Sequence, residues 1–225
     1  MDRALSQQLL GIAVVLVWLT GVVVVALGVR RRWPQQREWS RKVIHIGSGP
    51  AVLWAWGLGI DRWVALPAAI AATLAAAFNH RFRLLPAVED VGRHSYGTIA
   101  YGASVAILLG LFWPTTPGAV AAGVLVMAIG DGLAGLVGPQ LSSPRWRLFN
   151  QGKSMAGTLA MGLGGLTVLA LLQRAAQMNG MEAPGLPNLV LIAAVATALE
   201  QLSVLGIDNF SVPLSTGLLW EFWAR

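Results

Sequence analysis

The chain of 225 residues contains no cysteine, which excludes a disulfide framework and any zinc or iron–sulfur site built on thiolates. Charge is also scarce, because Asp, Glu, Lys and Arg make up only 12% of the residues, about half the share found in soluble domains. Hydrophobic residues make up 56% and occur in long uninterrupted runs. So few charges cannot cover a water-facing surface, and we expect a membrane protein with several spans.

A helix needs about 20 predominantly apolar residues to cross the hydrocarbon core of a bilayer. Seven runs approach this length, at residues 9–29, 43–60, 63–78, 97–113, 118–138, 155–172 and 187–206. The first is too long for the apolar part of a signal peptide, so we expect it to be retained. An eighth run, 212–223, is short and predicts a re-entrant or interfacial segment. The expected fold is an all-α polytopic transmembrane helical bundle, with residues 1–225 forming one domain.

Lysine and arginine outnumber the acids by 16 to 10, and their distribution predicts an orientation. If the connecting segments alternate between the two sides of the membrane, one side receives twelve cations: Arg30, Arg31, Arg32, Arg37, Arg41, Lys42, Arg81, Arg83, Arg93, Arg145, Arg147 and Lys153. The other side receives four: Arg3, Arg62, Arg174 and Arg225. The positive-inside rule makes the first side cytoplasmic. The excess of lysine and arginine therefore indicates how the chain is oriented in the membrane, and we expect no nucleic-acid partner.

Three acids lie inside or at the end of apolar runs, where a charged side chain costs about 2.5–3.5 kcal/mol. They are Asp131, Glu200 and Asp208, and all three fall on the basic side. One explanation is structural, with Asp131 pairing to an arginine and fixing two helices together. Convergence of three acids on one basic face instead indicates a functional site.

Basic and polar residues stand on the same side: Arg41, Lys42 and His45 at the start of the second run, Arg93 before the fourth, and Lys153 and Ser154 before the sixth. Singly, each is explained as a surface ion pair or a positive anchor at the membrane surface. Together with the acids they supply what a nucleoside triphosphate with Mg²⁺ requires. Cations bind the phosphate oxygens, and carboxylates bind the metal.

Two glycine-containing motifs match patterns of soluble nucleotide-binding proteins, but the neighbouring residues and elements that these patterns require are missing. Residues 130–135 (GDGLAG) fit the dinucleotide-binding pattern, yet no strand precedes them and no acid follows about twenty residues later. Residues 152–154 (GKS) fit the end of a P-loop, yet Arg147 stands where its first glycine is required. Gly130 and Gly132 still permit close backbone approach to phosphate. Helix packing through small residues explains them equally well.

Four blocks, in this order and spacing, resemble the CTP-dependent lipid-alcohol kinases, the dolichol kinase and phytol kinase family. They are residues 40–47 (SRKVIHIG), 130–138 (GDGLAGLVG), 152–158 (GKSMAGT), and Glu200 with residues 206–213 (GIDNFSVP). The likeness covers residues 37–214 and leaves 9–29 as an extra N-terminal span.

The resemblance implies CTP as phosphate donor, Mg²⁺ as divalent metal, and a lipid or isoprenoid alcohol in the bilayer as acceptor. Many dolichol-type members carry a glutamate before the glycine of the third block, where this chain has Ala156. This favours the phytol kinase branch, with phytol as acceptor and phytyl phosphate as product. Polyprenol, dolichol and diacylglycerol kinases stay open as alternatives. The related cytidylyltransferases fit less well, because their C-terminal signature of paired basic and acidic residues is absent.

The mechanism that the resemblance implies assigns roles to the residues above. Asp131, Glu200 and Asp208 are expected to hold the metal, while Asp131, Asp208 and Lys153 are expected to be catalytic, with either aspartate as proton acceptor. The nucleotide is expected to contact Arg41, Lys42, His45, Arg93, Gly130, Gly132, Lys153, Ser154 and Asn209. In a continuous helix Glu200 and Asp208 would lie about 12 Å apart. Both can serve one centre only if the helix breaks at Gly206 or if a contact with the nucleotide base gives them separate roles.

A membrane transporter is the alternative of another class, because intramembrane acids also bind ions near the midplane of transporters. The polar groups of this chain gather at one face and its halves show no inverted repeat, which favours the kinase. The sequence leaves the acceptor's chain length, the membrane concerned and the oligomeric state open.

Overall fold

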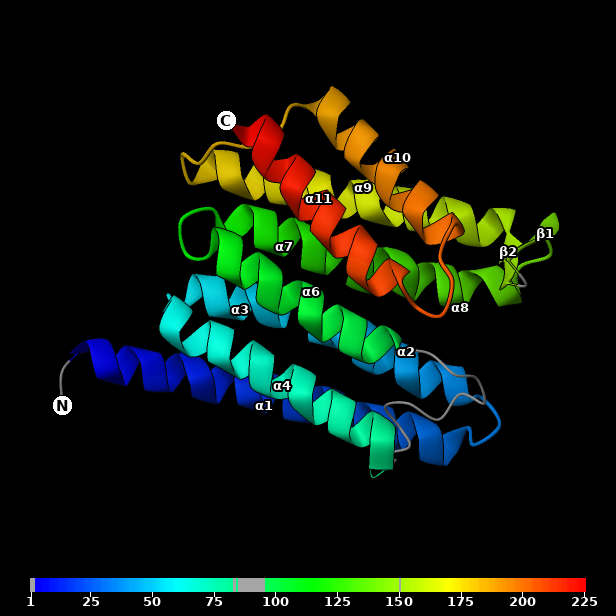
Figure 1. Ribbon diagram of the computed structural model, residues 1–225, viewed down its shortest axis with the longest axis horizontal. Coiled ribbons are helices and arrows are strands. Elements are labelled where there is room, and N and C mark those ends of the chain that lie inside the picture. The colour runs from blue at the N-terminus through cyan, green and yellow to red at the C-terminus, as the bar shows by residue number, and fades with distance from the viewer. Residues whose placement is uncertain (1–2, 83, 85–95, 150) are drawn as a thin grey trace.

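The computed structural model describes residues 3–82, 84, 96–149 and 151–225, which are helical apart from loops and one short hairpin. The elements lie side by side as a bundle (Figure 1). In chain order they are α1 (Arg3–Arg32), α2 (Arg37–Ser48), α3 (Ala51–Gly57), α4 (Arg62–Phe82), α6 (Gly97–Phe112), α7 (Pro117–Leu125), the π-helix η1 (Val126–Asp131), α8 (Gly132–Gln140), β1 (Arg145–Leu148), β2 (Gln151–Ser154), α9 (Met155–Met178), α10 (Leu186–Gln201) and α11 (Asp208–Ala224).

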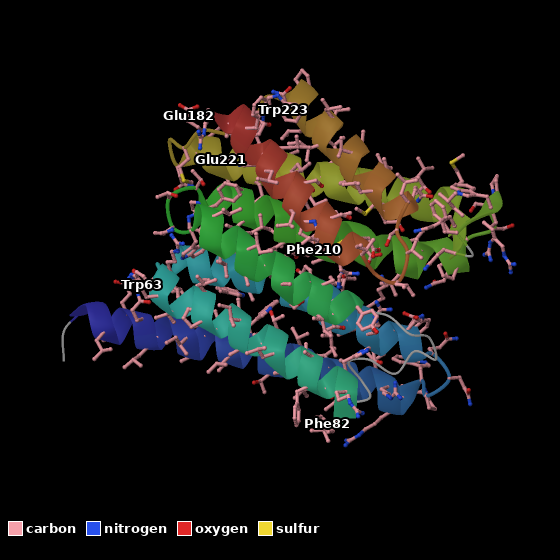
Figure 2. All side chains as sticks on the ribbon, in the orientation of Figure 1. Trp63, Phe82, Glu182, Phe210, Glu221 and Trp223 are labelled. Carbon is pink, nitrogen blue, oxygen red and sulfur yellow. The ribbon has the colours of Figure 1, made fainter. Side chains whose placement is uncertain are left out.

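The two ends of the bundle differ in charge. At one end α1 and α4 terminate, α2 begins, the β1–β2 hairpin projects, α10 ends and α11 begins (Figure 1). We call it the basic end, since these termini bring together Arg30, Arg31, Arg32, Arg41, Lys42, Arg81, Arg145, Arg147 and Lys153. Trp63 and Phe82 mark opposite ends of α4 (Figure 2). The basic residues that were assigned to one side therefore do share one end of the molecule, while Arg83 and Arg93 lie outside the described residues.

The stretch formed by α7, η1 and α8 lies at the centre of the bundle. In the most apolar 18 residues of this stretch, 61% are buried inside the protein, against 6% in the corresponding part of α1. Small residues allow this burial, because a β-carbon at Gly123 of α7 would collide with the backbone of Pro213 in α11. Asp131 is thus carried by the most enclosed element, whereas α1 lies at the edge with an exposed apolar surface suited to lipid.

Within the described part of the chain, four helical stretches are long and apolar enough to cross a membrane: Leu5–Arg32, Arg62–Phe82, Pro117–Gln140 and Met155–Met178. Two others, Gly97–Phe112 and Leu186–Gln201, are apolar but shorter. These helices support the assignment as a membrane protein, but seven spans are not confirmed. The expected span 43–60 is divided between α2 and α3, because Pro50 supplies no N–H to continue α2 beyond Gly49.

Two further elements differ from the expected fold. The short C-terminal apolar run belongs to the 17-residue helix α11, whose Val212 and Trp220 are in the core. Because the first turn of α11 is polar, the apolar run alone underestimates its length. The antiparallel strands β1 and β2 are an exception to an all-helical fold, with Trp146 opposite Lys153 in their register.

Candidate active site

Three carboxylates meet at the basic end. Asp131 ends η1, Glu200 lies in the last turn of α10 and Asp208 begins α11, and one side-chain oxygen of each lies within 4.8 Å of the others. Glu200 and Asp208 come together because the chain turns between them. Leu205 and Gly206 both adopt left-handed backbone, with φ of 56° and 87°. The helix break that a shared centre requires is therefore present.

Helix α2 supplies two partners for Asp131. Lys42 Nζ lies 2.6 Å from Asp131 Oδ2 and 3.1 Å from the Asp131 carbonyl oxygen, and both side chains are mostly buried. His45, one turn further along α2, places Nε2 3.3 Å from the same carboxylate oxygen. Among the described residues, the basic partner that ties Asp131 to another helix is thus a lysine and not an arginine.

The π-helix fixes how His45 acts. His45 Nε2 lies 3.2 Å from the carbonyl oxygen of Met127 in η1. A carbonyl oxygen only accepts hydrogen bonds, so this contact suits the tautomer with a proton on Nε2. His45 is therefore placed beside Asp131 and held there by η1. A π-turn of this kind often occurs at functional sites, because it changes which helical carbonyls are available.

The hairpin delivers the second lysine. Lys153 of β2 places Nζ 2.5 Å from Glu200 Oε1 and 2.8 Å from the Glu200 carbonyl oxygen. The other Glu200 oxygen accepts a hydrogen bond of 2.7 Å from Gln201, whose Nε2 also donates to the Thr158 hydroxyl at 3.0 Å. The side chains of Lys153 and Glu200 are only 12% and 9% exposed. Each of the two buried carboxylates therefore has its own lysine.

Glycines around Asp131 make these approaches possible. A β-carbon at Gly135 would collide with the end of the Lys42 side chain, which would have to shift from its present position beside Asp131. Added β-carbons at Gly130 and Gly132 would collide with side chains of α9 and α2. Packing thus accounts for Gly130 and Gly132, and their approach to phosphate stays a prediction.

Two other candidates have clear local contacts. Ser154 caps α9, since its hydroxyl oxygen accepts from the Gly157 N–H at 3.2 Å and donates to the Gly138 carbonyl at 3.3 Å. Asn209 is buried and its amide donates to Asp208 Oδ1 at 3.3 Å. Ser154 therefore fixes the junction between β2 and α9, and Asn209 fixes Asp208.

The two predicted arginines are placed differently. Arg41 adjoins Lys42 on α2, and its guanidinium lies 3.5 Å from Glu38. Arg93 lies outside the described residues, so its contact with phosphate stays a prediction.

The cluster suits a divalent cation. Three carboxylates so close together repel one another strongly in a medium of low dielectric constant. Lys42 and Lys153 compensate two of the charges, and among the described residues no lysine or arginine forms an ion pair with Asp208. Carboxylate oxygens are the ligands that Mg²⁺ prefers. The donor set therefore fits the metal that the family resemblance implies.

Three contributors were missed in the sequence. Gln201 and Thr158, which together hold Glu200, stand beside or inside the sequence blocks and could have been found by their position. The carbonyl of Met127 could not, because a backbone acceptor leaves no trace in residue type and depends on the π-turn.

Comparison with known proteins gives relatives of one kind. The phytol kinase of Synechocystis sp. is 39% identical over 203 residues, which are 90% of this chain and 86% of that protein. The probable chloroplastic phytol kinase of Triticum aestivum is 29% identical over 202 residues, covering 82% of this chain and 67% of that protein. Probable phytol kinase 2 of Glycine max is 28% identical over 191 residues, covering 82% and 65%.

No family model and no solved structure matches the chain. The three relatives nevertheless align with 82–90% of it, and their names agree with the branch that Ala156 favours. The dolichol-type and transporter alternatives find no comparable support. With 39% identity over most of both sequences, this chain belongs to the phytol kinase family.

Proposed function

We propose that this chain transfers the γ-phosphoryl group of CTP to the hydroxyl of phytol, giving phytyl phosphate and CDP. One observation carries the proposal: three carboxylates and two lysines from five separate segments meet at the basic end of a membrane-type bundle. The names of the relatives support phytol as the acceptor. The four sequence blocks support CTP as the donor.

The transfer forms one bond and breaks one. The alcohol oxygen bonds to the γ-phosphorus, and the bond from this phosphorus to the β–γ bridging oxygen breaks, so that its electron pair leaves with CDP. We assign the hydroxyl proton to Asp208, the carboxylate for which the described residues provide no lysine. The ammonium groups of Lys42 and Lys153 lie beside the other two carboxylates and are placed to neutralise phosphate oxygens.

The three carboxylates would hold Mg²⁺, which when bound neutralises charge on the transferred phosphate. The chain's own contribution is to fix these carboxylates before substrate binds. A neighbouring side chain contacts each of them: His45 at Asp131, Gln201 at Glu200 and Asn209 at Asp208. Such preorganisation is the largest source of rate acceleration in transfers of this type.

The assay that tests this function uses purified protein in detergent with CTP labelled in the γ-phosphate. We expect label on phytol, and less label on a polyprenol or on diacylglycerol at the same concentration. ATP at equal concentration should be a poorer donor. Faster labelling of diacylglycerol or polyprenol would contradict phytol as the acceptor, and no label on any alcohol would contradict the kinase function.

The basic end faces the cytoplasm in this proposal, as the positive-inside rule favours. In sealed vesicles with the original outer face exposed, external CTP should therefore give almost no product, since the charged nucleotide does not cross a bilayer. Permeabilising the vesicles should restore the rate. Full activity before permeabilisation would place the carboxylates on the opposite side of the membrane.

A further inference from the structure

An apolar groove of about 470 Å³ opens at the basic end between α1, α2 and α8. The residues that line it include Val29, Trp33, Trp39, Val43, Ile46 and Leu136. The rings of Trp33 and Trp39 meet edge to face with centroids 5.7 Å apart. A volume of this size is within the range of small-molecule sites, about 300–1,000 Å³.

The groove shares its walls with the carboxylate site. On α2, Lys42 and His45 contact Asp131, while Val43 and Ile46, the next residue in each case, line the groove. Helix α8 is arranged in a similar way. Its first residue, Gly132, follows Asp131 directly and packs against Ile46 of α2, and Leu136, one turn later, lines the groove. The groove and the site therefore lie on neighbouring faces of α2, where this helix packs against η1 and α8.

We propose that this groove binds the apolar chain of the acceptor alcohol, an inference that rests on the proposed kinase function. The acceptor must bring a hydroxyl to the carboxylates while its branched hydrocarbon chain stays out of water. This groove meets both requirements, because Val43 and Ile46 in its lining each follow a residue that contacts Asp131, and because the lipid-exposed helix α1 forms one of its walls. Its lining comes partly from α2, which carries Lys42, and from α8, which begins directly after Asp131.

A second apolar hollow on α1 serves as the comparison. Val14, Val17 and Trp54 are among the residues that line it. Val17 lies twelve positions before Val29 on the same helix, a rise of about 18 Å. This second hollow is equally apolar but lies further along α1 from the carboxylates. If a larger side chain raised the KM for phytol merely by disturbing contact with lipid, substitutions in both hollows would raise it.

The test fills each hollow with a larger side chain. Val43→Trp and Leu136→Trp should each raise the KM for phytol about tenfold, the loss expected when two or so methylene groups are displaced from an apolar site. The KM for CTP should change by less than about twofold, and a short isoprenoid alcohol should be affected less than phytol. Val17→Trp should behave as the unmodified protein does.

A second measurement covers the case in which the larger side chains disturb folding. A phytol analogue with a photoreactive group at the end of its chain should label peptides from α2 or α8 of the unmodified protein, and excess phytol should prevent the labelling. If the unmodified protein phosphorylates phytol, an unchanged KM in both filled variants or labelling confined to residues 13–18 would overturn the groove assignment. If it phosphorylates no alcohol, the proposed function fails with it.

Discussion

Asp131→Asn is expected to lower the rate of phosphoryl transfer by about a thousandfold, at the upper end of what single electrostatic groups contribute to such sites. Asparagine keeps the size of the side chain and one oxygen for Lys42, whose Nζ also retains the backbone carbonyl of residue 131 at 3.1 Å. The charge is lost, and with it the carboxylate that Lys42 and His45 hold in place. The measurement is the turnover rate with saturating CTP and phytol.

Asp61→Asn is the matched control for this substitution. Asp61 is exposed and lies between α3 and α4, at the other end of the bundle from the carboxylate cluster. It should retain the rate of the unmodified protein, and both variants should elute as folded protein from a sizing column in detergent. A rate for Asp131→Asn within about fivefold of the unmodified protein would reduce Asp131 to a residue that only joins η1 to α2.

The second large effect concerns the ion pair of Lys153 with Glu200. Lys153→Met leaves a buried carboxylate without its cation, which costs about 3–5 kcal/mol in comparable pairs. We expect both the thermal midpoint and the activity to fall. In the double variant Lys153→Met/Glu200→Gln no buried charge is left uncompensated, so the stability should largely recover while the activity does not.

The double variant separates a structural role from a catalytic one. Recovery of both stability and activity would show that the pair only holds β2 against α10. As a control, Arg225→Met removes the partner of Glu221, a carboxylate that is also mostly buried but lies at the other end of the bundle from the carboxylate cluster. Arg225 is 79% exposed, so water replaces part of its interaction and the loss of stability should be smaller than in Lys153→Met. The activity should not change.

The existence of the site could be predicted from the sequence because a bilayer makes buried acids expensive. Asp131, Glu200 and Asp208 stood out against apolar surroundings, and the positions of the cations placed all three on one side. The structure brings their oxygens within 4.8 Å of one another. Gly206 supplied a further sign, since a glycine between two acids that must converge indicates a turn, and it adopts φ of 87°.

The detailed geometry could not be predicted, because it depends on tertiary contacts. Nothing in residues 126–131 distinguishes a π-helix from an α-helix, yet the π-turn provides the Met127 carbonyl that fixes His45. Strand β1 (RWRL) alternates polar and apolar residues over only four positions, and β2 (QGKS) has no apolar residue. Phe149, between the strands, adopts φ of 48°, which residue preferences do not anticipate. Lys153 was therefore identified without the element that positions it.

The seven predicted spans are not confirmed for a similar reason. Counting apolar residues does not register a helix that is interrupted within the bundle, as at Pro50 between α2 and α3. Helix α2 is short, carries charged residues on one side, and buries Lys42 against Asp131. Its polar face contacts the carboxylate cluster and its apolar face lines the groove. The mean hydropathy of the run averages the two faces and therefore reveals neither.

The most direct test of the central claim, that Asp131, Glu200 and Asp208 form one divalent-cation site, is a titration of the purified protein with Mn²⁺ followed by electron paramagnetic resonance. We expect one saturable site, with binding weakened about tenfold or more, at least ~1.4 kcal/mol, in each of Asp131→Asn, Glu200→Gln and Asp208→Asn. Glu221→Gln, at the opposite end of the bundle (Figure 2), should bind as the unmodified protein does. Unchanged Mn²⁺ binding in all three carboxylate variants would contradict the claim.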